Sequence, residues 1–93
     1  MSENTTSIKG LIRETLRGIL KAWGMEATDE QLKKLVRKAL PMEVSDEAYS
    51  DAREWNQSQG YIRYRYDEED EVDLWKITER GITKVLQDEA PKG

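Results

Sequence analysis

Two clusters of lysine and arginine stand out in this 93-residue sequence. Their types and spacing would suit them to bind phosphate groups. One cluster follows a helical spacing, and the other alternates with tyrosines in the run YIRYRY. The residues are Lys33, Lys34, Arg37 and Lys38, then Arg63 and Arg65. Each cluster also has an ordinary structural explanation. The first suits the solvated face of an amphipathic helix, and the second suits cross-strand pairs with Asp73 and Glu71.

Charge is distributed unevenly along the chain, which carries a net charge of −4. Residues 1–40 hold eight Lys and Arg against five Asp and Glu, so this part carries +3 and residues 41–93 carry −7. The overall acidity disfavours a nucleic-acid partner, because phosphate binding depends on clustered cations. The asymmetry instead predicts two differently charged faces.

Several classes of function lack the residues they need. The sequence has no Cys and no His, which excludes disulfides and the usual transition-metal ligands. It also lacks a Gly-rich phosphate loop and a nucleophile motif, so we expect neither an enzyme nor a cofactor. The acidic run Asp67–Glu71 lacks the ligand order of a calcium loop, which favours a solvated turn. Without a long apolar run or a signal-like start, a cytoplasmic protein is expected.

Three helices are predicted in the first two thirds of the chain. Apolar residues recur at three- and four-residue steps from Ile8 to Trp23, and Gly24 follows as a stop. Thr28 to Gln31 has the form of a capping box that opens a second helix, which ends before Pro41. Ser45 caps a third helix that ends at Gly60. Its predicted inward residues are Ala48, Tyr49, Ala52 and Trp55.

After Gly60 the hydrophobic period changes from helical to twofold, which predicts a hairpin. Its strands contain residues 62–66 and 74–77, and residues 67–71 form the turn. Thr78 then caps a last helix whose Ile82, Val85 and Leu86 are expected to pack beside the first helix. The sequence thus predicts one mainly α domain with a small β-hairpin (α+β) over residues 7–87. Residues 1–6 and 88–93 are expected to be flexible ends.

The element order and the segments VSDEAYSDAREWNQSQGYI and LWKITERGITKVL resemble the bacterial winged helix-turn-helix regulators, above all small one-domain members, some from phage. The resemblance implies that the third helix is the recognition helix, that the hairpin is the wing, and that the second helix crosses the backbone of double-stranded DNA. It implies contacts to DNA from Lys33, Lys34, Arg37, Lys38, Ser50, Arg53, Asn56, Gln57, Arg63 and Arg65. It also allows a homodimer.

Two features of the third helix depart from that family. Positions where the family has aliphatic residues hold Tyr49, Arg53 and Asn56, which suggests a packing register shifted to Ala48, Ala52 and Trp55. Four acids also lie on this helix beside the single cation Arg53: Asp46, Glu47, Asp51 and Glu54. These acids favour an alternative in which a winged-helix protein-interaction module meets a basic protein partner, in phage assembly, host takeover or DNA mimicry. Any exposed residue among Tyr61, Tyr64 and Tyr66 would favour a protein interface as well.

Overall fold

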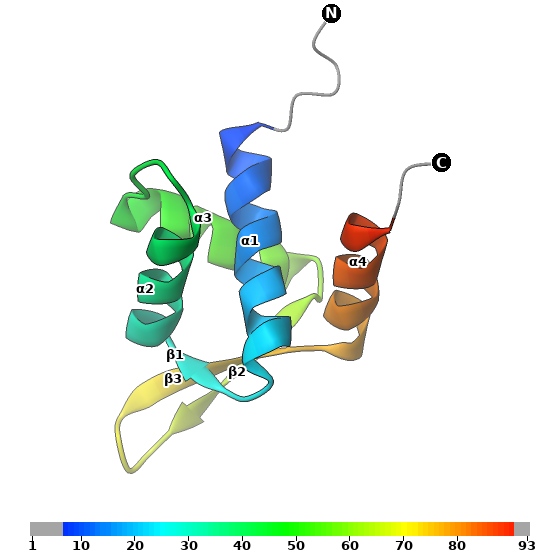
Figure 1. The fold of residues 1–93 in the computed structure, drawn as a ribbon. Helices are drawn as coiled ribbons and strands as arrows, with labels where there is room; N and C mark the ends of the chain where they lie inside the picture. Colours follow the sequence, from blue (N-terminus) through cyan, green and yellow to red (C-terminus); the bar gives the residue numbers. More distant parts are fainter. Residues whose placement is uncertain (1–6, 91–93) are drawn as a thin grey trace, which may run out of the picture.

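The computed structural model describes residues 7–90, which form four helices on one side of a small antiparallel sheet (Figure 1). In chain order the elements are α1 (Ile8–Trp23), β1 (Ala27–Thr28), α2 (Asp29–Ala39), α3 (Asp46–Ser58), β2 (Ile62–Asp67), β3 (Val72–Ile77) and α4 (Glu79–Glu89). The predicted order is confirmed, with the short strand β1 added to it. Within the described residues, no helix is both long and apolar enough to cross a membrane.

Helix α1 is the centre of the helical layer, and its ends are those the sequence predicts. The Ser7 side chain accepts a hydrogen bond from the Gly10 N–H at 2.9 Å. At the other end, Gly24 takes a left-handed conformation (φ 73°), which glycine adopts without steric cost. Between these caps, the buried Ile12, Leu16 and Leu20 point into the core. Local sequence therefore sets the length of α1, and its apolar stripe sets the face it buries.

Helix α2 begins with the predicted capping box. The Thr28 hydroxyl accepts from the Gln31 N–H at 3.1 Å, while the Gln31 side chain accepts from the Thr28 N–H at 3.0 Å. Ser45 caps α3 in the same way, accepting from the Ala48 N–H at 3.0 Å. Leu32 and Val36 are the fully buried residues of α2.

The predicted register of α3 is wrong in part. The helix buries Tyr49, Ala52 and Asn56, whereas Ala48 and Trp55 are only partly buried. Of the three positions where the resemblance implied aliphatic residues, Tyr49 and Asn56 point inward and Arg53 is partly buried. The sequence favoured Ala48 and Trp55 over Asn56 as buried residues, because burying an asparagine costs free energy unless its polar groups are hydrogen-bonded. The partners of Asn56 are distant in the chain, so the sequence alone does not reveal them.

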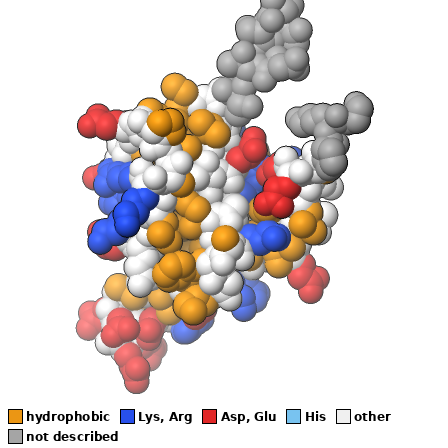
Figure 2. All heavy atoms as spheres, viewed as in Figure 1, with side chains coloured by type: hydrophobic (Ala, Val, Ile, Leu, Met, Phe, Trp, Pro, Cys, Tyr) orange, Lys and Arg blue, Asp and Glu red, His pale blue; other side chains and the backbone are white. Residues whose placement is uncertain are grey.

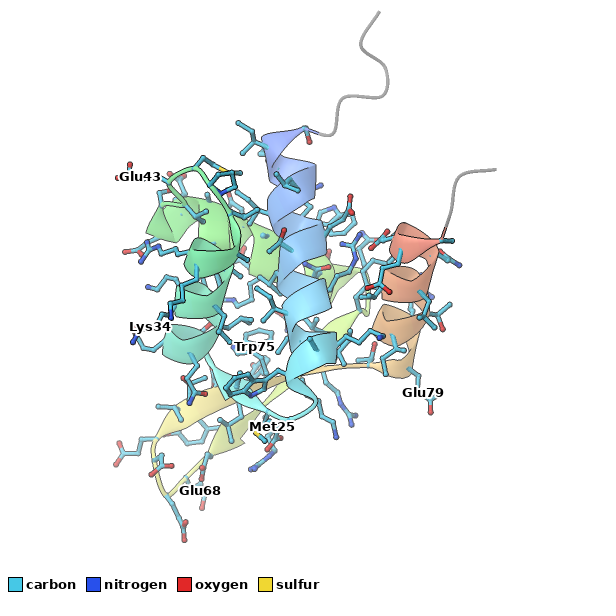
Figure 3. The ribbon with its side chains drawn as sticks, viewed as in Figure 1. Met25, Lys34, Glu43, Glu68, Trp75 and Glu79 are labelled. Carbon is cyan, nitrogen blue, oxygen red and sulfur yellow. The ribbon has the colours of Figure 1, made fainter. Side chains whose placement is uncertain are left out.

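The sheet has three antiparallel strands in the order β1-β3-β2, where the sequence predicted two. Ala27 lies opposite Trp75, and Tyr64 lies opposite Trp75 on the other side. Trp75 is buried and points from the sheet toward α1 and α2 (Figure 3). A two-residue strand is too short to show a twofold period, which explains why β1 was missed.

A buried arginine joins three of the helices. Arg17 of α1 is only 3% exposed, and its guanidinium donates to Asp88 of α4 at 2.9 Å and to the Asn56 side chain of α3 at 3.2 Å. The side-chain N–H groups of Asn56 donate in turn to the backbone oxygens of Arg13 and Ala52, at 3.1 and 3.0 Å. Asp88 thus belongs to the folded domain, although the sequence placed it in the flexible tail.

Helix α4 lies beside α1, as predicted, and is joined to the end of α3 (Figure 1). The Thr78 hydroxyl donates to the Gly60 and Tyr61 carbonyls at 2.6 and 3.0 Å, and it caps α4 by accepting from the Gly81 N–H at 3.0 Å. Val85 is buried as expected. Leu86, however, is 54% exposed and Ile82 also lies at the surface, so α4 packs through a narrower stripe than predicted.

Gly81 provides a test of the close contact between the start of α4 and the segment that follows α3. A Cβ atom at Gly81 would overlap the Tyr61 carbonyl oxygen and lie 2.7 Å from Ile77 Cγ1. We therefore expect Gly81→Ala to lower the free energy of unfolding by about 1–3 kcal/mol or more in urea denaturation. Gly18→Ala is the matched control, because nothing lies within 4 Å of its added methyl group. Because Gly18 lies inside α1, replacing it by alanine should raise the free energy of unfolding by about 0.5–1 kcal/mol. Equal urea midpoints for the Gly81 variant and the wild type would contradict the close approach.

Candidate nucleic-acid interface

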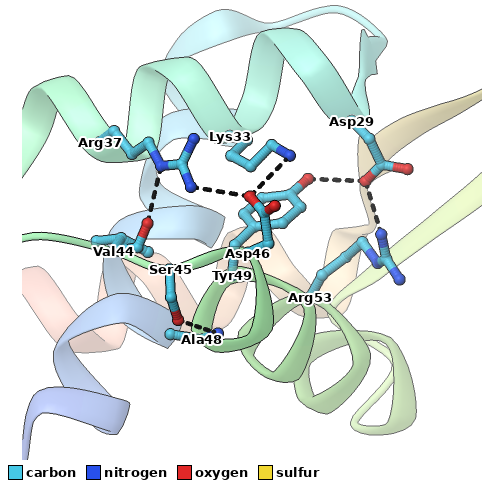
Figure 4. A network of polar contacts seen from close by, with 9 residues as sticks. All are labelled: Asp29, Lys33, Arg37, Val44, Ser45, Asp46, Ala48, Tyr49 and Arg53. Atoms are coloured by element: carbon cyan, nitrogen blue, oxygen red, sulfur yellow. Dashed lines mark hydrogen bonds and ion pairs between the residues drawn. The ribbon is translucent and has the colours of Figure 1, made fainter.

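An ion cluster fixes α2 against the start of α3 and uses two of the four predicted α2 cations. Asp46 accepts from Lys33 Nζ at 3.1 Å and from Arg37 at 2.9 Å, and Arg37 Nε also donates to the Val44 carbonyl at 2.8 Å (Figure 4). Hydrogen bonds from Lys33 and Arg37 hold the pKa of Asp46 below its ordinary value of 3.8. These exposed ion pairs link α2 to the start of α3 and add a small electrostatic contribution to the packing of the core.

Lys34 and Lys38 are the exposed remainder of the α2 cluster. Neither forms an ion pair within residues 7–90, and Lys34 points outward from α2 (Figure 3). The space-filling view shows lysine and arginine side chains gathered on this flank of the molecule, well above the acidic tip of the wing (Figure 2). This flank has the free charge that a phosphate backbone would need.

Arg53 of α3 is partly buried against the rest of the protein. It pairs with Asp29 at 2.9 Å, and its guanidinium lies 5.1 Å from the centre of the Trp75 ring. Burial, the largest single effect, lowers the pKa of Arg53, but the hydrogen bond to Asp29 and the charges of Asp29, Tyr49 and Glu54 together raise the pKa above its ordinary value. Asp29 also accepts from the Tyr49 hydroxyl at 2.8 Å (Figure 4). Burial, aided by this bond, raises the pKa of Tyr49.

Asn56, which was predicted to contact DNA, is buried and cannot do so. It is 0% exposed, and its side chain is hydrogen-bonded on both its oxygen and its nitrogen within the protein. Of the four α3 residues predicted to contact bases, Gln57 is exposed and Ser50 is partly exposed. The same helix exposes the acids Glu47, Asp51 and Glu54, which would repel phosphates at close range.

The wing has a basic outer face. Strand register puts Arg63 directly opposite Lys76, and Arg65 opposite Leu74, on the face turned away from the buried Trp75. The alternative explanation, that these arginines pair with Asp73 and Glu71, does not hold, because Asp73 lies opposite Tyr66 and Arg65 binds Glu26 instead. That contact is bidentate, at 2.7 and 2.9 Å. It lowers the pKa of Glu26 and raises the pKa of Arg65.

A shallow hollow of about 320 Å³ lies over this basic face. It is lined by Glu26, Arg63, Tyr64, Arg65, Leu74 and Lys76. Lys76 was not among the predicted contact residues, because its place beside Arg63 depends on the hairpin register. The loop leading into β3 lacks a diagnostic two-residue turn, so no signal in the sequence fixed that register.

The predicted contact residues therefore lie on separate surfaces. Arg53 stacks on Trp75 at the inner face of the sheet, whereas Arg63 and Arg65 project from the outer face. The α2 cluster forms a third group on its own flank. Among the described residues, exposed and unpaired cations occur on α2 and on the outer wing face, while the exposed part of α3 is acidic.

Comparison with known structures establishes the fold class. A transcriptional regulator from Clostridium thermocellum, Cth-833, matches with a TM-score of 0.73 at 20% sequence identity, over 87% of this chain and 79% of that chain. SSV1 F-93 matches with a TM-score of 0.64 at 19% identity, over 81% and 79%. A mutant of Lactococcus lactis ZitR in its apo form gives 0.61 at 22% identity, over 83% of this chain and 55% of that one.

The fold of this chain is accordingly a winged helix, mainly α, with α3 in the position of the recognition helix and β2–β3 as the wing. It shares this architecture with a transcriptional regulator. At these sequence identities the likeness concerns the fold alone. No family model matches the chain, and no curated protein matches its sequence.

Two sets of surface ion pairs, Asp46 with Lys33 and Arg37 and Glu26 with Arg65, predict how stability depends on pH. Asp46 and Glu26 have lowered pKa values in the folded protein, so their contributions are present above the ordinary values and are lost as pH falls. We expect the free energy of unfolding to fall between about pH 5 and pH 2. Asp46→Asn and Glu26→Gln should each make this fall smaller in thermal melts recorded across that range.

Glu68→Gln is the control for this pH series, because the Glu68 carboxylate lies at the wing tip without an ion pair among the described residues (Figure 3). It should leave the pH dependence unchanged. Identical pH profiles for the wild type, Asp46→Asn and Glu26→Gln would show that neither cluster contributes to stability.

Proposed function

We propose that the protein binds double-stranded DNA, as a regulator of the winged-helix type, mainly through the phosphate backbone. The observation that supports this most is the pair Arg63–Lys76. Like charges placed directly opposite each other destabilise a sheet, and here both lie on an exposed face, beside an Arg65 whose charge is already paired with Glu26. The phosphates of a bound DNA backbone would relieve this repulsion, and would thereby stabilise an arrangement of cations that lowers the stability of the free protein.

The α2 flank supplies the second group of phosphate contacts in this proposal. Lys34 and Lys38 are free to contact phosphates, and Lys33 and Arg37 add positive potential even though Asp46 partly compensates them. Ser50 and Gln57 are the α3 residues left to reach base edges. With so few base contacts, we expect a DNA affinity that depends weakly on sequence and strongly on salt.

A salt series with mixed-sequence duplex DNA tests the proposal. We expect the observed association constant to fall steeply as salt rises from about 50 to 200 mM. The double variant Arg63→Gln with Lys76→Gln should bind more weakly, and its slope of log affinity against log salt should be shallower by about 2, since each phosphate contact contributes about 0.9. Fluorescence anisotropy of a labelled duplex measures both quantities.

Lys84→Gln is the matched control in this series, because it removes a cation of α4 whose side chain already pairs with Asp88 at 3.6 Å. It should leave the slope unchanged. Absence of binding by the wild type at about 50 mM salt would end the DNA proposal.

A second candidate function is supported by the acids of α3. Glu47, Asp51 and Glu54 are exposed on this helix, and the wing exposes Tyr64 and Tyr66, a residue type enriched in protein interfaces. In this alternative the protein is an interaction module that uses these residues to bind a basic protein partner.

Glu54→Gln distinguishes the two functions. If α3 faces DNA, removing this carboxylate should raise DNA affinity several-fold at low salt, because it removes a repulsion of the phosphates. An unchanged affinity would mean that α3 points away from bound DNA and is free to contact a protein.

A further inference from the structure

A hollow of about 280 Å³ lies between α4 and the segment that joins α3 to the wing. Four of its lining residues come from one face of α4, and the fifth follows Gly60 at the start of that segment. Each of the five side chains carries a hydrogen-bond donor, and none carries a carboxylate. Helix α1 lies between α4 and α2, so the hollow is separate from the α2 flank (Figure 1). The lining residues are Tyr61, Arg80, Thr83, Lys84 and Gln87.

Positive charge is in excess around this hollow. The guanidinium groups of Arg17 and Arg80 lie 5.4 and 5.8 Å from the centre of the Tyr61 ring, whose face attracts cations. Asp88 binds Arg17 at 2.9 Å and lies 3.6 Å from Lys84 Nζ. Arg80 is exposed and forms no ion pair within residues 7–90. One carboxylate therefore serves three cations, and the hollow keeps a net positive charge.

We propose that this hollow binds a small oxyanion ligand, namely the phosphate monoester group of a small molecule. The Arg80 guanidinium offers a fork of N–H donors that matches two phosphate oxygens. Lys84 Nζ lies farther from Asp88 than a hydrogen bond allows, so this ammonium group keeps its donors for a ligand. The Thr83 hydroxyl and the Gln87 amide line the same hollow and supply uncharged donors.

The size and charge of the hollow favour a small phosphorylated molecule over the DNA backbone. Sites for drug-sized ligands span about 300–1,000 Å³, so a hollow of about 280 Å³ suits one phosphate group with a small remainder. A phosphate monoester carries a charge of about −1.5 to −2 at neutral pH, which two cations compensate, whereas each phosphate of DNA carries one charge. The hollow shares no residue with the proposed DNA contacts, so either proposal can fail without the other.

A ligand in this hollow would act on the joint between α3, the wing and α4. Tyr61 lies between α3 and β2, and its carbonyl accepts hydrogen bonds from the Thr78 N–H at 2.9 Å and from the Thr78 hydroxyl at 3.0 Å. A ligand bound by Arg80 and Tyr61 would add a further contact between α4 and the segment that leads into the wing. Because the unfolded chain has no such hollow, we expect the ligand to raise the melting temperature.

NMR titration of the isotopically labelled full chain with inorganic phosphate, from about 0.1 to 20 mM at constant ionic strength, tests the site. We expect the amide signals of Tyr61, Thr83 and Gln87 to shift together and to reach saturation in this range. A parallel titration with duplex DNA distinguishes the two sources of phosphate. If these signals shift with the duplex and not with inorganic phosphate, the hollow belongs to the DNA interface and the proposal of a small ligand is overturned.

Two variants remove the cations of the hollow. Arg80→Gln and Lys84→Gln should each raise the dissociation constant for inorganic phosphate at least about tenfold, because each removes a charge-assisted hydrogen bond. Lys9→Gln is the matched control, since it removes an exposed cation that lines a different hollow, between α1 and α3. It should bind phosphate like the wild type.

Circular dichroism melts should show that all the variants are folded, and that phosphate raises the melting temperature of the wild type and Lys9→Gln more than that of Arg80→Gln. The proposal is overturned by signals that do not saturate, by shifts spread equally over the cations of α2 and the wing, or by an Arg80→Gln variant that binds phosphate as tightly as the wild type.

Discussion

The buried charge of Arg17 is the constraint on which the arrangement of the helices depends. A guanidinium that is 3% exposed must have its hydrogen bonds met inside the protein, and here α3 and α4 supply them through Asn56 and Asp88. Breaking such a pair by removing one partner typically costs about 3–5 kcal/mol, so both helices are held to α1. Trp55, whose ring centre lies 6.0 Å from the guanidinium, helps to cover it. The polar centre explains how α3 can bury an asparagine, because Arg17 and two backbone carbonyls meet the hydrogen bonds of its side chain.

Charge also determines what α3 can offer to a partner. The only arginine of this helix pairs with Asp29 and stacks on Trp75, and Asn56 is turned inward. Its outward side chains are therefore mostly acids. Because the single cation of α3 is used to build the fold, the unpaired cations of the proposed interface lie on α2 and on the wing, and this separation is why phosphate contacts dominate the function we propose.

Local signals in the sequence were enough to predict most of the fold. Caps at Ser7, Thr28, Ser45 and Thr78 lie at the predicted helix starts, because capping depends on residues only three apart. What the sequence could not supply was pairing at long range. The strand β1, the contact of Arg65 with Glu26 and the place of Lys76 beside Arg63 all depend on register. For the candidate site, the sequence identified the clusters of cations, but it did not reveal which of these cations form ion pairs within the protein.

The position of β2 at the edge of the sheet has a consequence for the behaviour of the protein at high concentration. An edge strand presents unpaired backbone groups that invite a second strand, and uncontrolled addition of strands leads to fibres. In β2, Arg63 and Arg65 lie on one face of that edge, and Arg65 is paired with Glu26, so two such strands aligned side by side would bring two unpaired guanidinium groups together. Repulsion between two copies of Arg63 thus opposes such stacking, and a polyanion that neutralised Arg63 would weaken this protection.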